Sequence, residues 1–380
     1  MEPMTNTARV ALMALLLSTG ALALTTPGRL HRAGSLSVPR AAQTATTLLD
    51  GQVLIVGGCT RPSCELDAQS ATAELFDPRT GQLRPTGSLA SPRVSQTATR
   101  LADGQVLIAG GWTVGRVVDT AERYDPQTGR FTLTTPMRER RSAHTATLLA
   151  DGRVLITGGT VREGRALNSA EVYTPQTGQF VPVGSLTQAR AAHVAVRLMD
   201  GRVLIAGGHA DRSGALDTLE LFDPKTNTFH AAGRMTTPRN KLAGTLLPSG
   251  QVLLLGGTRG YDRDTVLTSA EVFDPARKAT RVTASMTRPR YKFTDAVVRL
   301  ADGRILVAGA GGADVYTEQR QGVGLGRFDA VMGTMPGNDQ FVTVSRLPDG
   351  GALIAGGYDA GIQPTAALWR FQPDVARPAP

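Results

Sequence analysis

The sequence contains few aromatic residues and no dense cluster of positive charge. Phe, Tyr and Trp together make up 5% of its 380 residues, although the formal net charge is +9. Because stacking on bases requires aromatic rings, and because neither a run of Lys and Arg nor a nucleic-acid motif accompanies the charge, we expect no nucleic-acid partner. The excess of arginine should instead attract anionic ligands.

Motifs for catalysis and for metal binding are also lacking. We find no nucleophile elbow, no His-Glu-x-x-His and no phosphate-binding loop. Histidine occurs five times, at His31, His144, His193, His209 and His230. His144 and His193 each stand three residues after an arginine, at Arg141 and Arg190. Gln43 and Gln96 stand at the same distance after Arg40 and Arg93. Gln and His at one position suggest a hydrogen-bonding role, so we expect no metal and no cofactor.

Long hydrophobic runs are absent except near the start of the chain. Arg9 is followed by an apolar stretch from Val10 to Leu24, with the small-x-small pattern Ala21-Leu22-Ala23. This predicts a signal peptide over residues 1–23 and a secreted, periplasmic or cell-surface protein. The alternative is a retained N-terminal anchor, although the run is short for a membrane span. We expect no later transmembrane segment.

Cysteine occurs twice, at Cys59 and Cys64, within one loop. In an exported chain an isolated pair is most simply a disulfide. The alternative, a zinc site, has neither a nearby histidine nor a second cysteine pair.

A pattern of about fifty residues recurs along the rest of the chain. Each copy holds a hairpin turn of the Asp-Gly type, at Asp50-Gly51, Asp103-Gly104, Asp151-Gly152, Asp200-Gly201, Ser249-Gly250, Asp302-Gly303 and Asp349-Gly350. Such a period indicates one supersecondary unit that stacks on copies of itself. In the third copy, a strand ending near Leu149 should turn into Val154-Leu155-Ile156, whose unbroken apolar run predicts a strand buried on both faces. A third strand follows at 170–173. A turn ending in Gly178 then leads into a fourth, and Asn227 replaces that glycine in the next copy.

These features resemble the kelch repeat. The resemblance rests on a pair of adjacent glycines, the glycine doublet, after the second strand and on a Glu-x-aromatic element in the third strand. The doublet stands at Gly57-Gly58, Gly110-Gly111, Gly158-Gly159, Gly207-Gly208, Gly256-Gly257 and Gly356-Gly357, and it becomes Gly309-Ala310 in the sixth copy. The resemblance implies an all-β, seven-bladed kelch-like β-propeller with four antiparallel strands per blade.

The ends of the chain indicate how the ring closes. Residues 28–36 match 81–89, the fourth strand of the first copy, and the chain stops soon after a third strand near Phe371. We expect this N-terminal strand to complete the last blade. The propeller would then occupy residues 24–375 as one domain, followed by a tail over 376–380.

One arginine per copy precedes the first strand: Arg40, Arg93, Arg141, Arg190, Arg239 and Arg290, with Asp339 in the seventh copy. One interpretation places these side chains around the channel mouth, where they would bind carboxylate, sulfate or phosphate. The other pairs each arginine with an acid of the repeat, such as Glu122 or Glu171, inside the sheet.

The loops between the second and third strands differ most among the copies and should carry recognition. They contain Trp112, His209, Tyr261 and Tyr358 as candidate ligand-binding residues. We therefore expect a binding module for an anionic glycan or an acidic protein segment, of undetermined oligomeric state.

Two kelch-like enzyme classes are the alternatives. One resembles the sialic-acid mutarotases, which need acids and arginines around the channel. The other resembles the copper radical oxidases, which need a cysteine cross-linked to a tyrosine, and this sequence has both cysteines in one loop.

Overall fold

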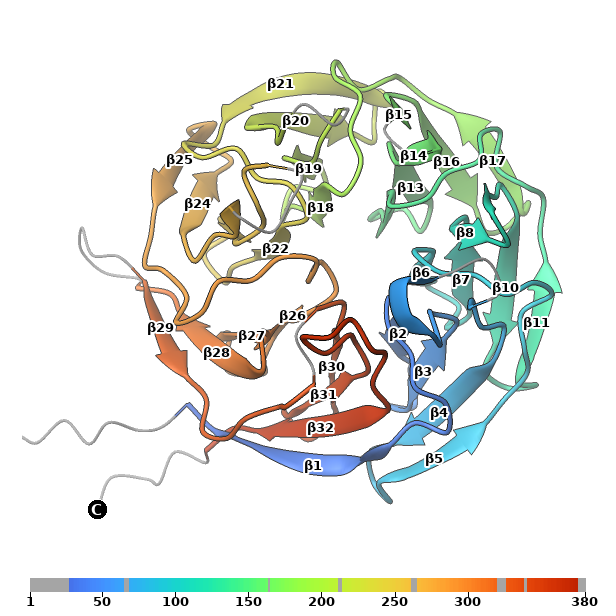
Figure 1. Cartoon of the computed structure of the whole chain (residues 1–380). Helices are drawn as coiled ribbons and strands as arrows, with labels where there is room; N and C mark the ends of the chain where they lie inside the picture. Colours follow the sequence, from blue (N-terminus) through green and yellow to red (C-terminus); the bar gives the residue numbers. More distant parts are fainter. Residues whose placement is uncertain are drawn as a thin grey trace, which may run out of the picture.

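The computed structural model describes residues 27–64, 68–162, 165–210, 214–260, 265–319, 326–337 and 340–374. Within them the chain forms seven four-stranded antiparallel sheets, arranged as blades around a central channel (Figure 1). The predicted all-β, seven-bladed propeller is confirmed. The predicted signal peptide over 1–23 and the tail over 376–380 lie outside the described residues. No helix in the described part of the chain is long and apolar enough to cross a membrane.

The strands of each blade follow one another from the channel outward. Blade one contains β2 (Thr44–Thr47), β3 (Val53–Val56), β4 (Ala73–Asp77) and β5 (Gln82–Pro85). Blade two contains β6 (Thr97–Arg100), β7 (Val106–Ala109), β10 (Ala121–Asp125) and β11 (Arg130–Leu133). Blade three contains β12 (Thr145–Leu148), β13 (Val154–Thr157), β16 (Ala170–Thr174) and β17 (Gln179–Pro182). Blade four contains β18 (Val194–Arg197), β19 (Val203–Ala206), β20 (Thr218–Asp223) and β21 (Thr228–Arg234).

The remaining blades repeat the order. Blade five contains β22 (Ala243–Leu246), β23 (Val252–Leu255), β24 (Ala270–Asp274) and β25 (Ala279–Val282). Blade six contains β26 (Val297–Arg299), β27 (Ile305–Gly309), β28 (Gly312–Thr317) and β29 (Arg327–Ala330). Blade seven contains β30 (Thr343–Arg346), β31 (Ala352–Ala355), β32 (Ala367–Gln372) and β1 (Arg29–Ser35). Loops between second and third strands add the hairpins β8 (Trp112–Thr113) with β9 (Arg116–Val117) and β14 (Thr160–Arg162) with β15 (Arg165–Ala166), and a 3-10 turn, η1 (Pro62–Cys64).

The second strand of each blade is the centre of the core. In β13 all four residues are buried, as the unbroken apolar run predicted. Its register places Ile156 between Ala146 of β12 and Glu171 of β16. The apolar side chains of adjacent blades pack together face to face, so that the core is a series of clusters between the blades.

The glycine doublets and the last positions of the outer turns have positive φ angles. A side chain on Gly158 would collide with the carbonyl oxygen of Arg190 in the next blade, and its φ is +58°. Asn227, which replaces the turn glycine in blade four, also has a positive φ, of 55°. Asparagine tolerates this left-handed conformation better than most residues do.

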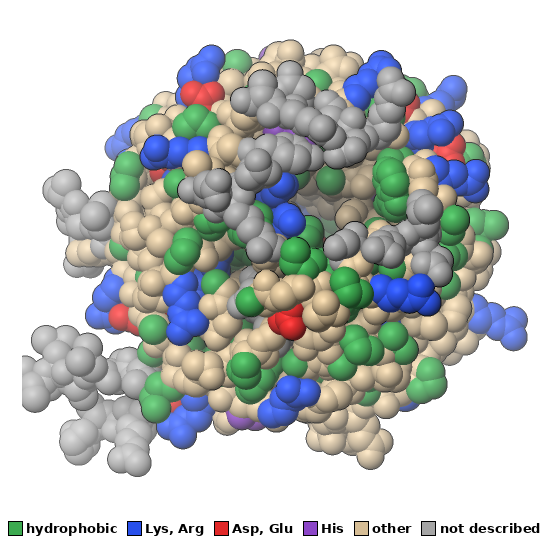
Figure 2. Space-filling view, in the orientation of Figure 1, with side chains coloured by type: hydrophobic (Ala, Val, Ile, Leu, Met, Phe, Trp, Pro, Cys, Tyr) green, Lys and Arg blue, Asp and Glu red, His purple; other side chains and the backbone are tan. Residues whose placement is uncertain are grey.

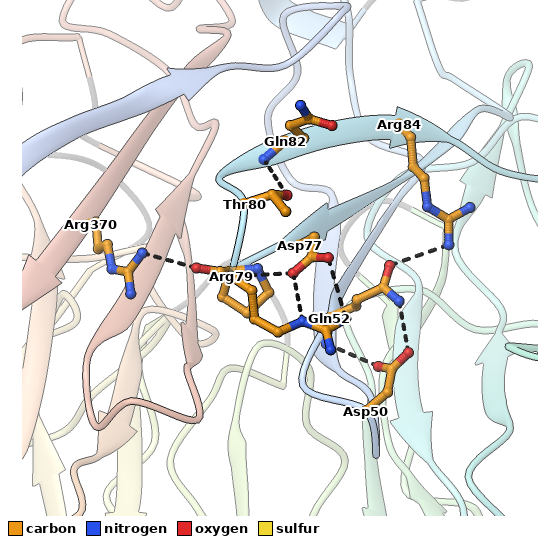
Figure 3. Close-up of polar contacts among 9 residues, drawn as sticks. Asp50, Gln52, Asp77, Arg79, Thr80, Gln82, Arg84 and Arg370 are labelled. Atoms are coloured by element: carbon orange, nitrogen blue, oxygen red, sulfur yellow. Dashed lines mark hydrogen bonds and ion pairs between the residues drawn. The ribbon is translucent and has the colours of Figure 1, made fainter.

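The ring closes through the N-terminal strand, as predicted. In Figure 1, β1 (blue) lies on the outer edge of β32 (red), and the register pairs Leu30 with Phe371. On the face that carries the Asp-Gly turns, Arg370 of blade seven also donates a hydrogen bond to the carbonyl oxygen of Pro78 in blade one, at 3.2 Å (Figure 3). Arg370 is ion-paired with Asp349 of its own blade, so one side chain joins the last blade to the first.

Candidate functional site

The arginine of each copy points into its own blade and away from the channel. In blade four, Nη1 of Arg190 donates to the carbonyl oxygens of Gly207, at 2.9 Å, and Thr218, at 3.1 Å. Nη2 lies 2.7 Å from a carboxylate oxygen of Glu220 on β20. The guanidinium therefore links the end of the second strand to the third strand.

The other described copies repeat this arrangement. Five of the arginines are fully buried and Arg290 is 2% exposed. The ion pairs, with their N···O distances, are Arg40–Glu74 (3.0 Å), Arg93–Glu122 (2.8 Å), Arg141–Glu171 (2.8 Å), Arg190–Glu220 (2.7 Å), Arg239–Glu271 (3.1 Å) and Arg290–Asp314 (2.7 Å). The interpretation that placed these arginines around the channel mouth is therefore wrong, because the six cations are buried inside the blades and form no ring there. Burial of the arginine lowers the pKa of Arg190, and the charge of Glu220 opposes this shift.

The acid of each pair also holds the segment that enters the blade. The backbone N–H of Thr187 donates to Glu220 at 2.7 Å, and that of Thr236 donates to Glu271 at the same distance. Thr187 and Thr236 lie in the linkers that bring the chain from one outer strand to the next inner strand. The carboxylate thus fixes both the arginine and the linker.

Blade seven departs from this rule. Asp339, at the position of the arginine, lies outside the described residues. Trp369 occupies the position of the acid, because it pairs with Ile354 as Glu74 pairs with Ile55. The acid has therefore been replaced in the same blade whose sequence lacks the arginine.

The Gln and His side chains after the arginines join neighbouring blades. Nε2 of Gln43 donates to the carbonyl oxygen of Ala355 at 2.8 Å, and Nε2 of His193 lies 3.0 Å from the hydroxyl of Thr145. The predicted hydrogen-bonding role is confirmed. Burial lowers the pKa of His144 to about 3 and that of His193 well below its usual value, with nearby arginines adding to both shifts.

Two residues after each arginine position, the backbone forms a ring around the channel. Seven residues there have φ between 51° and 55°: Ala42, Ser95, Ala143, Ala192, Lys241, Lys292 and Phe341. From Ser95 to Phe341, the N–H of each donates to the carbonyl oxygen of the preceding member, at 2.8–3.4 Å. These hydrogen bonds help to offset the cost of the left-handed conformation for non-glycine residues. We call these seven residues the mouth ring.

A cavity of about 770 Å³ lies at the mouth ring. The Lys, Arg, Asp and Glu residues among its described lining are Lys241, Lys292 and Asp295. Trp112, Phe341 and Tyr358 are its aromatic residues. Figure 2 shows this face, with Lys and Arg side chains (blue) beside the central hollow.

The other predicted site residues take part to different extents. Trp112, His209 and Tyr358 line the cavity, and Tyr261 lies outside the described residues. Nδ1 of His209 lies 2.9 Å from the side-chain oxygen of Asn240. Tyr358 is 5% exposed, and burial raises its pKa to about 12. These side chains therefore form the wall of the cavity beside the mouth ring.

Sequence reasoning missed Lys241, Lys292, Phe341 and Asp295. The sequence did contain a signal for three of them: the residue two positions after the arginine is small in the first four copies and large in the last three. Asp295 lies where the arginine-to-turn spacing grows from ten residues to twelve.

Cys59 and Cys64 form a disulfide in the blade-one loop, and Cys59 is fully buried beside Ala41 and Tyr358. The described residues contain no group of three or more His, Cys, Asp or Glu side chains that could hold a metal ion.

A second hollow, of about 1170 Å³, lies on the opposite face near blades four to six. Its charged side chains neutralise one another, as in Arg202–Asp200 at 2.6 Å and Arg277–Asp274 at 2.8 Å. The cavity at the mouth ring is therefore the better candidate site, although it is smaller.

A family model described as the Kelch motif matches residues 93–138, 141–187 and 190–236. Each match begins at the arginine of a buried pair, and together they cover blades two to four. No curated protein matches the chain.

Replacing Arg190 with Ala should lower the free energy of unfolding by about 3–5 kcal/mol, because Glu220 would be left buried without its cation. Urea denaturation measures this change. The double variant Arg190→Met/Glu220→Gln should be less destabilised, because it removes both charges and keeps an acceptor for Thr187. The exposed Arg130, changed to Ala, is the control and should shift stability by no more than about 0.5 kcal/mol. A loss below about 1 kcal/mol for Arg190→Ala would contradict the structural role.

The buried histidines predict a loss of stability in acid. Because the folded pKa of His144, about 3, lies below the unfolded value, its stabilising contribution is present above about pH 6.5 and declines as pH falls towards 3. Between pH 6.5 and 5 the parent protein should lose about 2 kcal/mol more than His144→Gln, as measured by urea denaturation. An identical pH dependence in the two proteins would exclude His144 as the cause.

Proposed function

Since the chain is a kelch-repeat β-propeller protein, we propose that it is an interaction module that binds a partner protein at the mouth of the central channel. The observation that carries this proposal is the cavity at the mouth ring, which combines two cations with aromatic walls. A rigid ring of blades with variable loops around one opening is the arrangement in which loops carry specificity.

An acidic segment of the partner is the first candidate ligand. Lys241 and Lys292 are successive members of the mouth ring and both are partly exposed. The ammonium of Lys292 lies 5.2 Å from the ring centroid of Phe341, which restricts its position. Two lysines on adjacent blades can each contact a carboxylate of one extended segment. An anionic glycan offers the same charge, and it would use Trp112 or Phe341 for stacking.

Export from the cytoplasm is part of the proposal. The apolar stretch from Val10 to Leu24 supports it, and the disulfide between Cys59 and Cys64 is of a kind that persists in oxidising compartments.

The alternative is a carbohydrate-active enzyme of the sialic-acid mutarotase type. Asp295 favours it, since a carboxyl in the channel with a raised pKa could transfer protons. Acceleration of anomer exchange in a sialic acid would support this alternative, whereas the binding module should cause none. The copper radical oxidase alternative loses its cross-linking cysteine, because both cysteines are joined to each other.

The double variant Lys241→Gln/Lys292→Gln should lose retention on an array of acidic peptides, with its melting temperature unchanged. In the parent protein, retention should weaken as salt rises, because the contacts are exposed ion pairs. The control is Lys225→Gln/Lys278→Gln, which removes the same charge from exposed turns on the opposite face. Equal losses in the two double variants would show attraction to net charge and would contradict a site at the mouth ring. Retention on anionic glycans in place of peptides would identify the ligand as a sugar.

If the chain is exported with cleavage, the protein recovered outside the cytoplasm should have the mass of a chain lacking residues 1–23. Intact-mass spectrometry measures this. A chain of full mass found only in the cytoplasm would contradict export.

A further inference from the structure

In blade six, the segment from the arginine to the hairpin turn is two residues longer than in the preceding blade. Arg290 precedes Asp302 by twelve residues, whereas Arg239 precedes Ser249 by ten. The additional length forms a turn, in which the N–H of Ala296 donates to the carbonyl oxygen of Phe293 at 2.8 Å. Strand β26 therefore begins only at Val297.

The turn presents Thr294 and Asp295 to the cavity. Both are exposed, while Phe293 and Ala296 on either side are buried. The carbonyl oxygen of Asp295 accepts a hydrogen bond from the N–H of Val344 in blade seven, at 2.8 Å. The backbone of the turn is thus held between two blades, and the carboxyl is left to face the channel.

The carboxyl of Asp295 has no hydrogen bond or ion pair with any described residue. The ammonium of Lys292, three residues earlier, lies 5.4 Å from the ring centroid of Tyr291 and 5.2 Å from that of Phe341. The carboxyl can be reached from the cavity, but protein surrounds it, and this loss of hydration raises the pKa of Asp295. A cation brought by a ligand would relieve this cost.

The opposite wall leaves room for such a group. The inner strands of blades one to five present small residues to the cavity: Ala45, Ala98, Ala146, Ala195 and Gly244. The connection between the second and third strands of blade six is also short, because only Ala310 and Gly311 join them.

We infer that Thr294 and Asp295 form a subsite for a primary ammonium group on the ligand. The carboxylate and the hydroxyl of these residues accept hydrogen bonds from two of the three N–H donors of such a group. A divalent metal ion would need further oxygen or nitrogen ligands, and no described group of His, Cys, Asp or Glu supplies them. This inference deepens the proposed function: the bound segment offers carboxylates to Lys241 and Lys292 and an ammonium to Asp295. The ammonium is either the α-amine of a chain end or a lysine side chain.

The test uses n-butylammonium as the probe and n-butanol as its neutral counterpart, with binding followed by ligand-observed NMR. The parent protein should bind the ammonium saturably and the alcohol far more weakly. Asp295→Asn, which keeps the shape of the side chain, should weaken ammonium binding at least about tenfold, since it removes the charge. Asp329→Asn, on the outer strand of the same blade, is the matched control and should leave binding unchanged. Equal binding by Asp295→Asn, or no saturable binding by the parent, would overturn the inference.

Acidic peptides separate this inference from the proposed function and identify the source of the ammonium. Three peptides of one sequence are compared: one with a free α-amine and no lysine, one acetylated with a lysine, and one acetylated without lysine. If Asp295→Asn weakens binding of the first peptide, the ammonium is the α-amine. If it weakens binding of the second peptide, the ammonium is the lysine side chain. If all three depend on Lys241 and Lys292 but not on Asp295, the proposed function stands and the ammonium subsite falls. If butylammonium binds as expected but no acidic peptide does, the subsite stands and the acidic-segment proposal falls.

Discussion

The buried pair of arginine and acid is the interaction on which the propeller depends. Removing both charges from water costs several kcal/mol per ion, and the cost is met only because every pair has further hydrogen-bond partners. In blade four the guanidinium satisfies the carbonyl groups of Gly207 and Thr218, and Glu220 accepts the N–H of Thr187. One ion pair thereby fixes the second strand, the third strand and the incoming linker of a blade. Each residue of the mouth ring lies two positions after an arginine position. In the six blades that have the pair, the pair therefore also positions the rim of the channel.

Two sets of charges in this protein differ in their surroundings. The arginine and the acid of each repeated pair, such as Arg190 and Glu220, are buried and bound to each other. Those that interrupt the repeat, namely Lys241, Lys292 and Asp295, line the cavity. A repeat protein builds its scaffold by copying one unit, so a residue found in one or two copies is free of that structural demand. The binding site should therefore be sought where the copies differ.

Much of the fold could be predicted from the sequence, because each blade is specified locally. The Asp-Gly turns, the apolar second strands and Asn227 in a glycine position each correspond to one backbone requirement. Closure by residues 28–36 could also be predicted, since an unmatched fourth strand needs a third. The direction of the arginines could not, because a spacing shows that they are equivalent but not whether they point into the sheet or the channel. The mouth ring was hidden for another reason: Ala42, Lys241 and Phe341 share a backbone conformation and no side-chain chemistry.

The claim that repeated charges build the scaffold while irregular ones bind is tested most directly by saturation mutagenesis of the displayed protein. Each variant is scored both for the amount of folded protein and for retention of an acidic peptide carrying an ammonium group. Substitutions at the buried pairs should reduce the folded amount, whereas substitutions at Lys241, Lys292 and Asp295 should reduce retention while the folded amount stays constant. Retention that is insensitive to these three positions, or lost only together with folding, would contradict the account.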